Sequence, residues 1–273
     1  MSTNQDYHLN TLSDIAKKGN LILFIGAGLS VGAGLPNWIS MARTITKHLN
    51  YVLPREDHFI STDHLIQSFQ YFENRNGRNI LIQRIRELLD TTNADPTEIH
   101  QLLPSFPSRI IFSTNYDDLI EKAYSISHKK VHVISSDLEI AYWSEDNTQI
   151  IKLCGNLSRP ETIAITKRDF NLFFMTRPRL VDLLINRLES ADALFLGYSL
   201  RDPFFNQIWD TIGNSLGAHR RLGHAIMFNL RDFEIEDLER RKIVPISFQA
   251  NGNIDMTQKM SSFLRSLLTR FQG

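Results

Sequence analysis

The chain has 273 residues, of which 42% are hydrophobic and 22% charged, so it can form one large or two small globular domains. Its 30 basic and 30 acidic residues cancel, which argues against direct nucleic-acid binding and against attraction to a membrane surface. Cys154 is the only cysteine, which excludes an internal disulfide and a cysteine-based zinc site, and the polar N-terminal segment lacks a signal pattern, so we expect a cytoplasmic protein.

A helix is predicted over residues 6–19, followed by a short apolar run over residues 21–25 that is typical of a buried strand. This run stops at Gly26-Ala27-Gly28. A strand that enters a glycine turn and then a helix is typical of pyrophosphate sites, because glycines admit the phosphates and free N–H groups at the helix start face them. The glycine spacing departs from G-x-G-x-x-G, and a purely structural turn is the alternative.

Helices dominate the next part of the chain. Pro36 or Asn37 is expected to begin a helix over residues 37–50. Two more helices follow in a block over about 51–103, which we expect to be a helical subdomain inserted into a single domain of residues 1–273. These two helices are predicted over residues 61–74 and 78–90.

Strands and helices then alternate to the end of the chain. Strands are expected over residues 109–114, 130–134, 149–153, 162–165, 193–196, 224–229 and 243–248. Helices are expected over residues 117–124, 167–174, 179–190, 203–216, 232–241 and 257–271. This alternation predicts an α/β fold with a Rossmann-like, doubly wound, mainly parallel sheet.

Small or polar residues follow five of the predicted strands, where an open α/β sheet binds its ligands. After the first strand, the candidates are Asn115 and Asp117, Cys154, Gly197 and Ser199, and Asn229. Each also has a structural explanation, as a helix cap, a turn residue or a small core residue.

The set GAGLSVGAGLP, FSTNYDDL, KLCGNL, LFLGYSLRDP and AIMFN resembles the sirtuin-like domain of bacterial defence proteins over about residues 10–250. The resemblance implies an NAD glycohydrolase that cleaves NAD, as its substrate, to nicotinamide and ADP-ribose in antiviral defence. It implies that Asn115 orients water or the ribose and that Asp117 holds nicotinamide or faces the developing positive charge. The implied NAD contacts are Gly26, Ala27, Gly28, Ser30, Gly34, Pro36, Gly197, Ser199 and Asn229.

Three departures from the sirtuin pattern matter. The four-cysteine zinc ribbon of the deacylases is absent, and no metal is expected. Asn37-Trp38-Ile39 stands where deacylases have Asp-Phe-Arg, as in relatives that hydrolyse NAD. Cys154 stands where the family has its catalytic histidine.

The cysteine bears directly on catalysis. A thiol is a poorer base than imidazole, with a reference pKa of about 8.5 against about 6.5. The resemblance therefore predicts turnover slowed by up to roughly 10²–10⁴-fold, with NAD binding largely intact. A lowered thiol pKa at a helix N-terminus, or entry of His100 or His132 into the site, would restore a base.

An NAD-depleting activity has to be restrained in a healthy cell. We therefore expect control through a homo-oligomer or a separate partner, and the resemblance points to a HerA-type ATPase. Two alternatives remain open. One is a catalytically weak module that binds NAD or ADP-ribose and signals to a partner. The other is a deacylase or ADP-ribosyl transferase, which the missing zinc ribbon disfavours.

Overall fold

The computed structural model describes residues 3–49, 51, 53–55 and 60–272. Within these residues, seven strands form one sheet with the order β3-β4-β2-β1-β5-β6-β7, and every neighbouring pair is parallel. The strands are β1 (Leu21–Ile25), β2 (Ile110–Ser113), β3 (Val131–Ile134), β4 (Thr148–Lys152), β5 (Asp192–Leu196), β6 (Gly223–Phe228) and β7 (Ile243–Phe248). The predicted doubly wound parallel sheet is confirmed.

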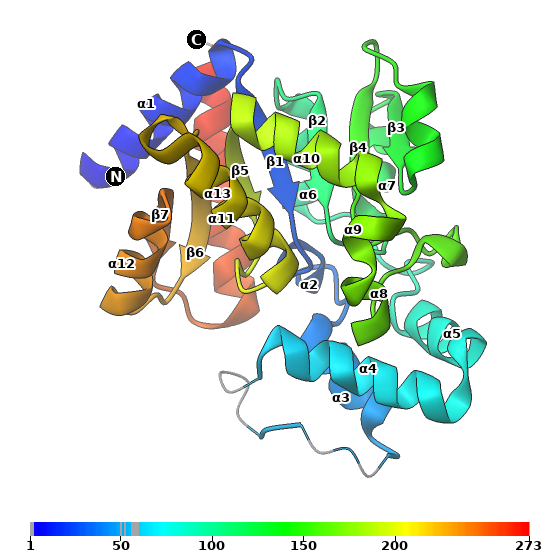
Figure 1. Ribbon diagram of the computed structural model, residues 1–273. Coiled ribbons are helices and arrows are strands. Elements are labelled where there is room, and N and C mark those ends of the chain that lie inside the picture. The colour runs from blue at the N-terminus through cyan, green and yellow to red at the C-terminus, as the bar shows by residue number, and fades with distance from the viewer. Residues whose placement is uncertain (1–2, 50, 52, 56–59, 273) are drawn as a thin grey trace.

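Helices lie on both faces of this sheet and beyond the carboxyl ends of its strands (Figure 1). The longer ones are α1 (Thr3–Lys17), α3 (Trp38–Thr46), α4 (Thr62–Asn76), α5 (Arg78–Leu88), α7 (Leu119–Ile126), α10 (Pro178–Ser190), α11 (Pro203–Leu216), α12 (Asp232–Arg240) and α13 (Gly252–Gln272). Short helices are α2 (Gly28–Val31), α6 (Glu98–Leu102), α8 (Lys167–Asn171) and α9 (Phe173–Thr176). No helix within the described ranges is long and apolar enough to cross a membrane.

The first strand shows why the apolar run is continuous. Ile22 and Phe24 pack into one core, with α10 and α11, while Leu21, Leu23 and Ile25 pack into the other, with α1 and α13. Side chains alternate between the two faces of a strand, so a strand covered on both faces is apolar at every position.

A third core joins the helical layer, formed by α3, α4 and α5, to the carboxyl ends of the strands. Figure 1 shows these helices in blue and cyan below the sheet. Asn37 caps the start of α3, because its side chain accepts the Ser40 N–H at 2.9 Å. Of the two residues that the sequence offers as the start of this helix, Pro36 and Asn37, the structure thus has Asn37. Residues 50, 52 and 56–59, which fall in the predicted helix and inserted block, lie outside the described residues.

Three sequence expectations about elements were wrong. Residues 162–165 are not a strand of the sheet: a 3₁₀ turn (Pro160–Thr162) occupies the start, and Thr162 Oγ1 donates to the Arg159 carbonyl at 2.7 Å. The helix predicted from residue 117 begins at Leu119, whose N–H donates to Asp117 Oδ1 at 3.2 Å. The helix predicted over residues 167–174 is divided into α8 and α9.

Candidate functional site

Two glycine loops meet where β1 and β5 end. Gly26 N–H donates to Leu196 O at 3.0 Å, and Gly28 N–H donates to Gly197 O at 2.9 Å. A Cβ added at Gly28 would lie 2.7 Å from Gly197 O, and one added at Gly197 would lie 2.4 Å from Leu29 N. The glycines are therefore needed for the contact between the loops themselves.

These bonds correct one expectation about the glycine turn. Besides Gly28, Leu29 N–H donates to Gly26 O at 3.1 Å and Ser30 N–H donates to Ala27 O at 3.1 Å. The amides of Leu29 and Ser30, at the start of the four-residue α2, are thus used inside the turn, and that of Gly28 bonds to the neighbouring glycine loop. The predicted free N–H groups at the helix start are therefore wrong for these three residues.

A cavity of about 460 Å³ opens beyond β1, β5 and β6, under the helical layer. Its volume is that of a small-molecule site. Four predicted contacts line it: Ala27, Gly28, Gly197 and Ser199. Apolar groups from three distant parts of the chain complete the walls, among them Trp38, Leu65, Tyr198, Met227, Met256 and Met260. The helices that bring Trp38 and Met256 here carry no local signal of this role in the sequence.

The cavity has few charged groups. Asp202 lines it, but Tyr198 Oη donates to its Oδ2 at 3.1 Å and Phe204 N–H donates to its Oδ1 at 2.9 Å. Burial raises the pKa of Asp202. Arg201 also lines the cavity and pairs with Glu234 at 3.1 Å. A ligand entering here meets an apolar wall with a small number of directional polar groups, which is typical of small-molecule pockets.

Three predicted polar residues form one buried chain of hydrogen bonds. Asn115 Nδ2 donates to Ser30 Oγ at 3.1 Å, and Ser30 Oγ donates to Asp117 Oδ2 at 2.9 Å. All three residues are buried, with 2–5% of their surface exposed. Asn115 Oδ1 is buried and has no hydrogen-bond partner among the residues that the structure describes. Such an unpaired acceptor is costly unless a water or a ligand donates to it.

The residues after β2 separate two hollows. Thr114 lines the first cavity, whereas Tyr116, Asp117 and Asp118 line a second one of about 710 Å³ beyond β2, β3 and β4. Asn115 follows Thr114 in the chain and lines neither cavity, while Asp117 forms part of the wall of the second. The polar chain therefore stands at the partition between the two.

The structure places the candidate bases unequally. His100 is fully buried, and Thr97 N–H donates to its Nδ1 at 3.2 Å. Within the described part of the chain, its Nε2 has no hydrogen-bond partner. Burial lowers the pKa of His100 to about 4, and the nearby Asp117 carboxylate opposes that shift. His132 lies on β3, where its Nδ1 faces Gln149 Oε1 at 3.0 Å, away from the strand ends.

Cys154 is 1% exposed and packs in the third core, with no place in the lining of the 460 Å³ cavity. Burial raises the pKa of its thiol, so the alternative of a lowered thiol pKa is wrong. Arg177, which sequence reasoning did not select, is buried beside it and donates to the carbonyls of Leu153 and Thr162. We expected five strand ends around one crevice, but the end of β4, where Cys154 lies, does not line this cavity.

Other predicted contacts shape loops. Gly34 has φ of +86° in the turn that closes when Leu35 N–H donates to Ser30 O at 3.2 Å, and Pro36 follows in the chain. Asn229 has φ of +54°, and its side chain bridges to both backbone groups of Ala250, at 2.9 and 2.8 Å. Neither Pro36 nor Asn229 lines the cavity.

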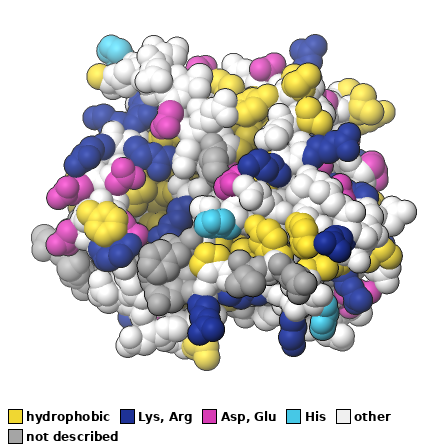
Figure 2. All heavy atoms as spheres, turned by 60° about the horizontal axis from the view of Figure 1, so that its bottom comes forward, with side chains coloured by type: hydrophobic (Ala, Val, Ile, Leu, Met, Phe, Trp, Pro, Cys, Tyr) yellow, Lys and Arg dark blue, Asp and Glu magenta, His cyan; other side chains and the backbone are white. Residues whose placement is uncertain are grey.

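No three His, Cys, Asp or Glu side chains group as a metal site within residues 3–49, 51, 53–55 and 60–272. On the face shown in Figure 2, Lys and Arg are interspersed with acidic and apolar side chains.

The chain is similar to known proteins in sequence and in fold. A family model described as a SIR2-like domain matches residues 109–255. The chain is 28% identical over 275 residues to the "NAD(+) hydrolase ThsA" of Acinetobacter baumannii, covering 94% of this chain and 54% of the relative. It is 22% identical over 203 residues to "Defense-associated sirtuin 2" of Bacillus subtilis, covering 73% of this chain and 20% of that protein. The chain spans about half the length of the ThsA relatives that it matches.

Among solved structures, a Sir2 homologue in complex with NAD superposes with a TM-score of 0.58 at 14% identity. The match covers 96% of this chain and 94% of the other. At this identity the likeness concerns the fold alone.

Proposed function

The chain belongs to the SIR2-like domain family, and we propose that it hydrolyses NAD to nicotinamide and ADP-ribose. The observation that carries the proposal is the Oδ1 of Asn115, which is buried at the end of the Asn115–Ser30–Asp117 chain and has no partner among the described residues. Thr114, the preceding residue, lines the apolar cavity. NAD fits these residues, because a ribose hydroxyl or a water can donate to that oxygen. Relatives named NAD(+) hydrolase support the same reaction.

In the proposed reaction, the bond between nicotinamide and the ribose carbon breaks, and its electron pair leaves with nicotinamide. The ribose carbon gains oxocarbenium character, and a water then adds to it and releases a proton. Asn115 Oδ1 orients the water or a ribose hydroxyl, while Asp117, through the Ser30 hydroxyl, presents negative charge. With the Ser30 hydroxyl in between, the carboxylate acts at about 6 Å, where it contributes roughly 3 kcal/mol at an effective dielectric constant near 20, about a hundredfold in rate.

For the cofactor contacts, we propose that Ala27, Gly28, Gly197 and Ser199 meet NAD directly in the cavity that they line. Gly26, Gly34, Pro36 and Asn229 stay proposed contributors through the loops they form. Cys154 keeps the histidine position in the sequence, but its buried thiol remains protonated at neutral pH and supplies no base. The same observation favours the second candidate, a module that binds NAD or ADP-ribose with little catalysis.

The test is nicotinamide release from NAD by the wild-type chain and by Asn115→Ala and Cys154→His. Hydrolysis predicts release that Asn115→Ala reduces by about 10²-fold or more, because the orienting acceptor is lost. Cys154→His is expected to raise the rate, by up to about 10²-fold if the imidazole reaches the ribose. Binding of NAD is followed in parallel by calorimetry.

The outcomes separate the candidates. A silent wild-type chain that binds NAD and that Cys154→His activates identifies the weak binding module. If wild type and both variants neither bind nor cleave NAD, both candidates are wrong. We also propose that the chain acts in antiviral defence. Its activity would be controlled by self-assembly or by a HerA-type ATPase.

A further inference from the structure

Tyr116 lies between the two polar residues of the proposed site, Asn115 and Asp117. Its side chain points away from them, into the third core, where it is 3% exposed. Its hydroxyl donates to the Ala164 carbonyl at 2.8 Å. Its ring stacks on that of Trp38, with centroids 6.4 Å apart and planes 7° from parallel. The backbone that carries Asn115 is thus fixed from the side of the helical layer.

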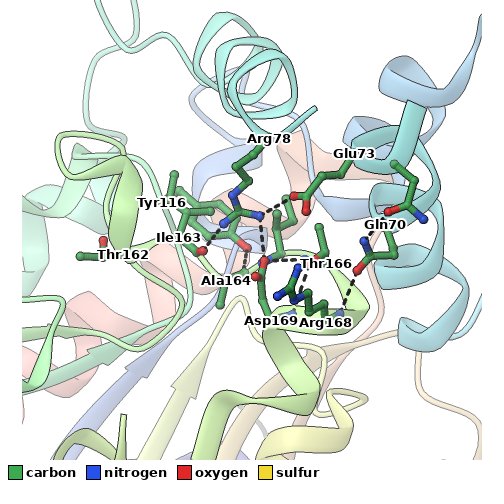
Figure 3. A network of polar contacts seen from close by, with 12 residues as sticks. Gln70, Glu73, Arg78, Tyr116, Thr162, Ile163, Ala164, Thr166, Arg168 and Asp169 are labelled. Atoms are coloured by element: carbon green, nitrogen blue, oxygen red, sulfur yellow. Dashed lines mark hydrogen bonds and ion pairs between the residues drawn. The ribbon is translucent and has the colours of Figure 1, made fainter. Parts of the chain in front are cut away.

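The segment that accepts the Tyr116 hydroxyl is itself held by the helical layer (Figure 3). Arg78, the first residue of α5, donates to Ile163 O at 2.5 Å and pairs with Asp169 at 2.9 Å. Asp169 Oδ2 in turn accepts the N–H of Ile165 at 2.9 Å. Because Ala164 stands between two of these anchored residues, the carbonyl that Tyr116 reaches has a fixed position.

A second contact joins the same parts. Arg168 N–H donates to Gln70 Oε1 on α4 at 3.0 Å, and Arg78 also pairs with Glu73 on α4 at 2.9 Å (Figure 3). Figure 3 therefore shows a continuous polar network from α4 and α5 to the loop after β2. Charge-assisted bonds of this kind give geometric definition as well as free energy.

We propose that Tyr116 and Arg78 are positioning residues for NAD hydrolysis, which couple the helical layer to the orientation of Asn115 and Asp117. The proposal rests on the hydrolysis proposed above. Neither residue lines the 460 Å³ cavity, so both act through the placement of Asn115 and Asp117. A misplacement of a reacting group by about 1 Å costs on the order of 10²-fold in rate.

The decisive variant is Tyr116→Phe, which keeps the stacked ring and removes the hydroxyl. Tyr124→Phe is the matched control, because Tyr124 is also buried and its hydroxyl donates to a backbone carbonyl, that of Leu103, at 3.2 Å. Each variant removes a buried hydroxyl that donates to a backbone carbonyl. We expect Tyr116→Phe to lower kcat for nicotinamide release about tenfold with less than about a twofold change in KM. Tyr124→Phe is expected to leave both constants unchanged.

Arg78 supplies the test of coupling. Arg78→Gln is expected to lower kcat in the same way. Arg78→Lys is expected to retain part of the wild-type kcat, because Lys keeps the positive charge and can reach one of the three partners of Arg78, which are Ile163 O, Asp169 and Glu73. Adding Tyr116→Phe to Arg78→Gln is expected to cost little more, because the two changes break the same connection. Arg84→Gln, at an exposed ion pair with Glu87 on the same helix, is the control.

The results distinguish the two proposals. If the wild-type chain releases no nicotinamide, the hydrolysis is wrong and the positioning role falls with it. If the wild type is active and Tyr116→Phe matches Tyr124→Phe in kcat, the positioning role alone is wrong. Additive losses in the Tyr116→Phe, Arg78→Gln pair would equally overturn it.

Discussion

At the scale of single residues, the buried histidines set the pH behaviour of the fold. His100 and His224 are both buried, and desolvation lowers the pKa of each to about 4, below the ordinary value of 6.5. The unfolded chain therefore binds more protons than the folded one between these values. The stability that follows is present above about pH 6.5 and is lost as the pH falls toward 4.

His224→Gln tests this sign. The free energy of unfolding of the wild type should fall between about pH 7.5 and pH 5, and His224 should account for about 2 kcal/mol of the loss. The variant is therefore expected to show a shallower pH dependence in urea unfolding. Equal slopes in the wild type and the variant would contradict the assignment.

At the same scale, Cys154 illustrates what burial does to a motif. The resemblance to sirtuin-like domains puts it at the position of a catalytic histidine, but the side chain lies in the third core, with a raised thiol pKa. Chemistry that depends on a thiolate is therefore disfavoured at this position. In the proposed site, the polar contacts to the substrate are therefore assigned to Asn115, Ser30 and Asp117.

At the scale of elements, the loops after β1 and β5 act as one unit. Gly197 has φ of +61°, and an added Cβ would meet Leu29 N at 2.4 Å, in the backbone of α2. The backbone cannot retreat without moving the cavity wall that Ala27 and Gly28 form. The packing of the loops and the shape of the cavity are thus the same feature.

Gly197→Ala is expected to destabilise the protein by more than about 2 kcal/mol and to weaken NAD binding. Gly19→Ala is the control, because Gly19 has φ of +72° but no atom within 4 Å of its added Cβ. That control should cost only the backbone strain of about 1–2 kcal/mol. Chemical unfolding of the two variants measures the difference. Equal losses would show that the loop contact tolerates a side chain.

At the scale of the whole molecule, strand order decides what meets at the site. β1 and β5 are neighbours in the middle of the sheet, so the two glycine loops lie side by side although about 170 residues separate them in the sequence. α1 and α13 pack together on one face, where Arg270 pairs with Asp6. The first and last helices thereby complete the layer of helices that covers one face of β1.

Assembly is the prediction at this scale. We expect the chain to form a homo-oligomer and to co-elute with a HerA-type ATPase, with a changed rate of nicotinamide release in the complex. Size-exclusion chromatography with light scattering, on the chain alone and with the ATPase, measures both. A monomer whose elution and activity the ATPase leaves unaltered would contradict this prediction.

The sequence by itself determined the fold class and the chemistry available. The alternation of apolar runs and amphipathic segments indicates a parallel sheet covered on both faces, because a strand covered on both faces, such as β1, is apolar throughout. The same reading selected Asn115, Asp117 and Gly197, since glycine turns and polar strand ends have local signatures, whereas Ser30 came from the resemblance to sirtuin-like domains. It also limited the cysteine chemistry to one residue.

Only the tertiary structure decided which of these residues meet. Asn115 bonds to Ser30 across 85 residues, and Trp38 and Met256 come together in the cavity wall from opposite ends of the chain. The sequence could not show that Cys154 and Tyr116 face a core or that Arg177 is buried beside them. Local patterns record the free energy of forming one element, whereas burial and pairing depend on the neighbours that the packed sheet and helices supply.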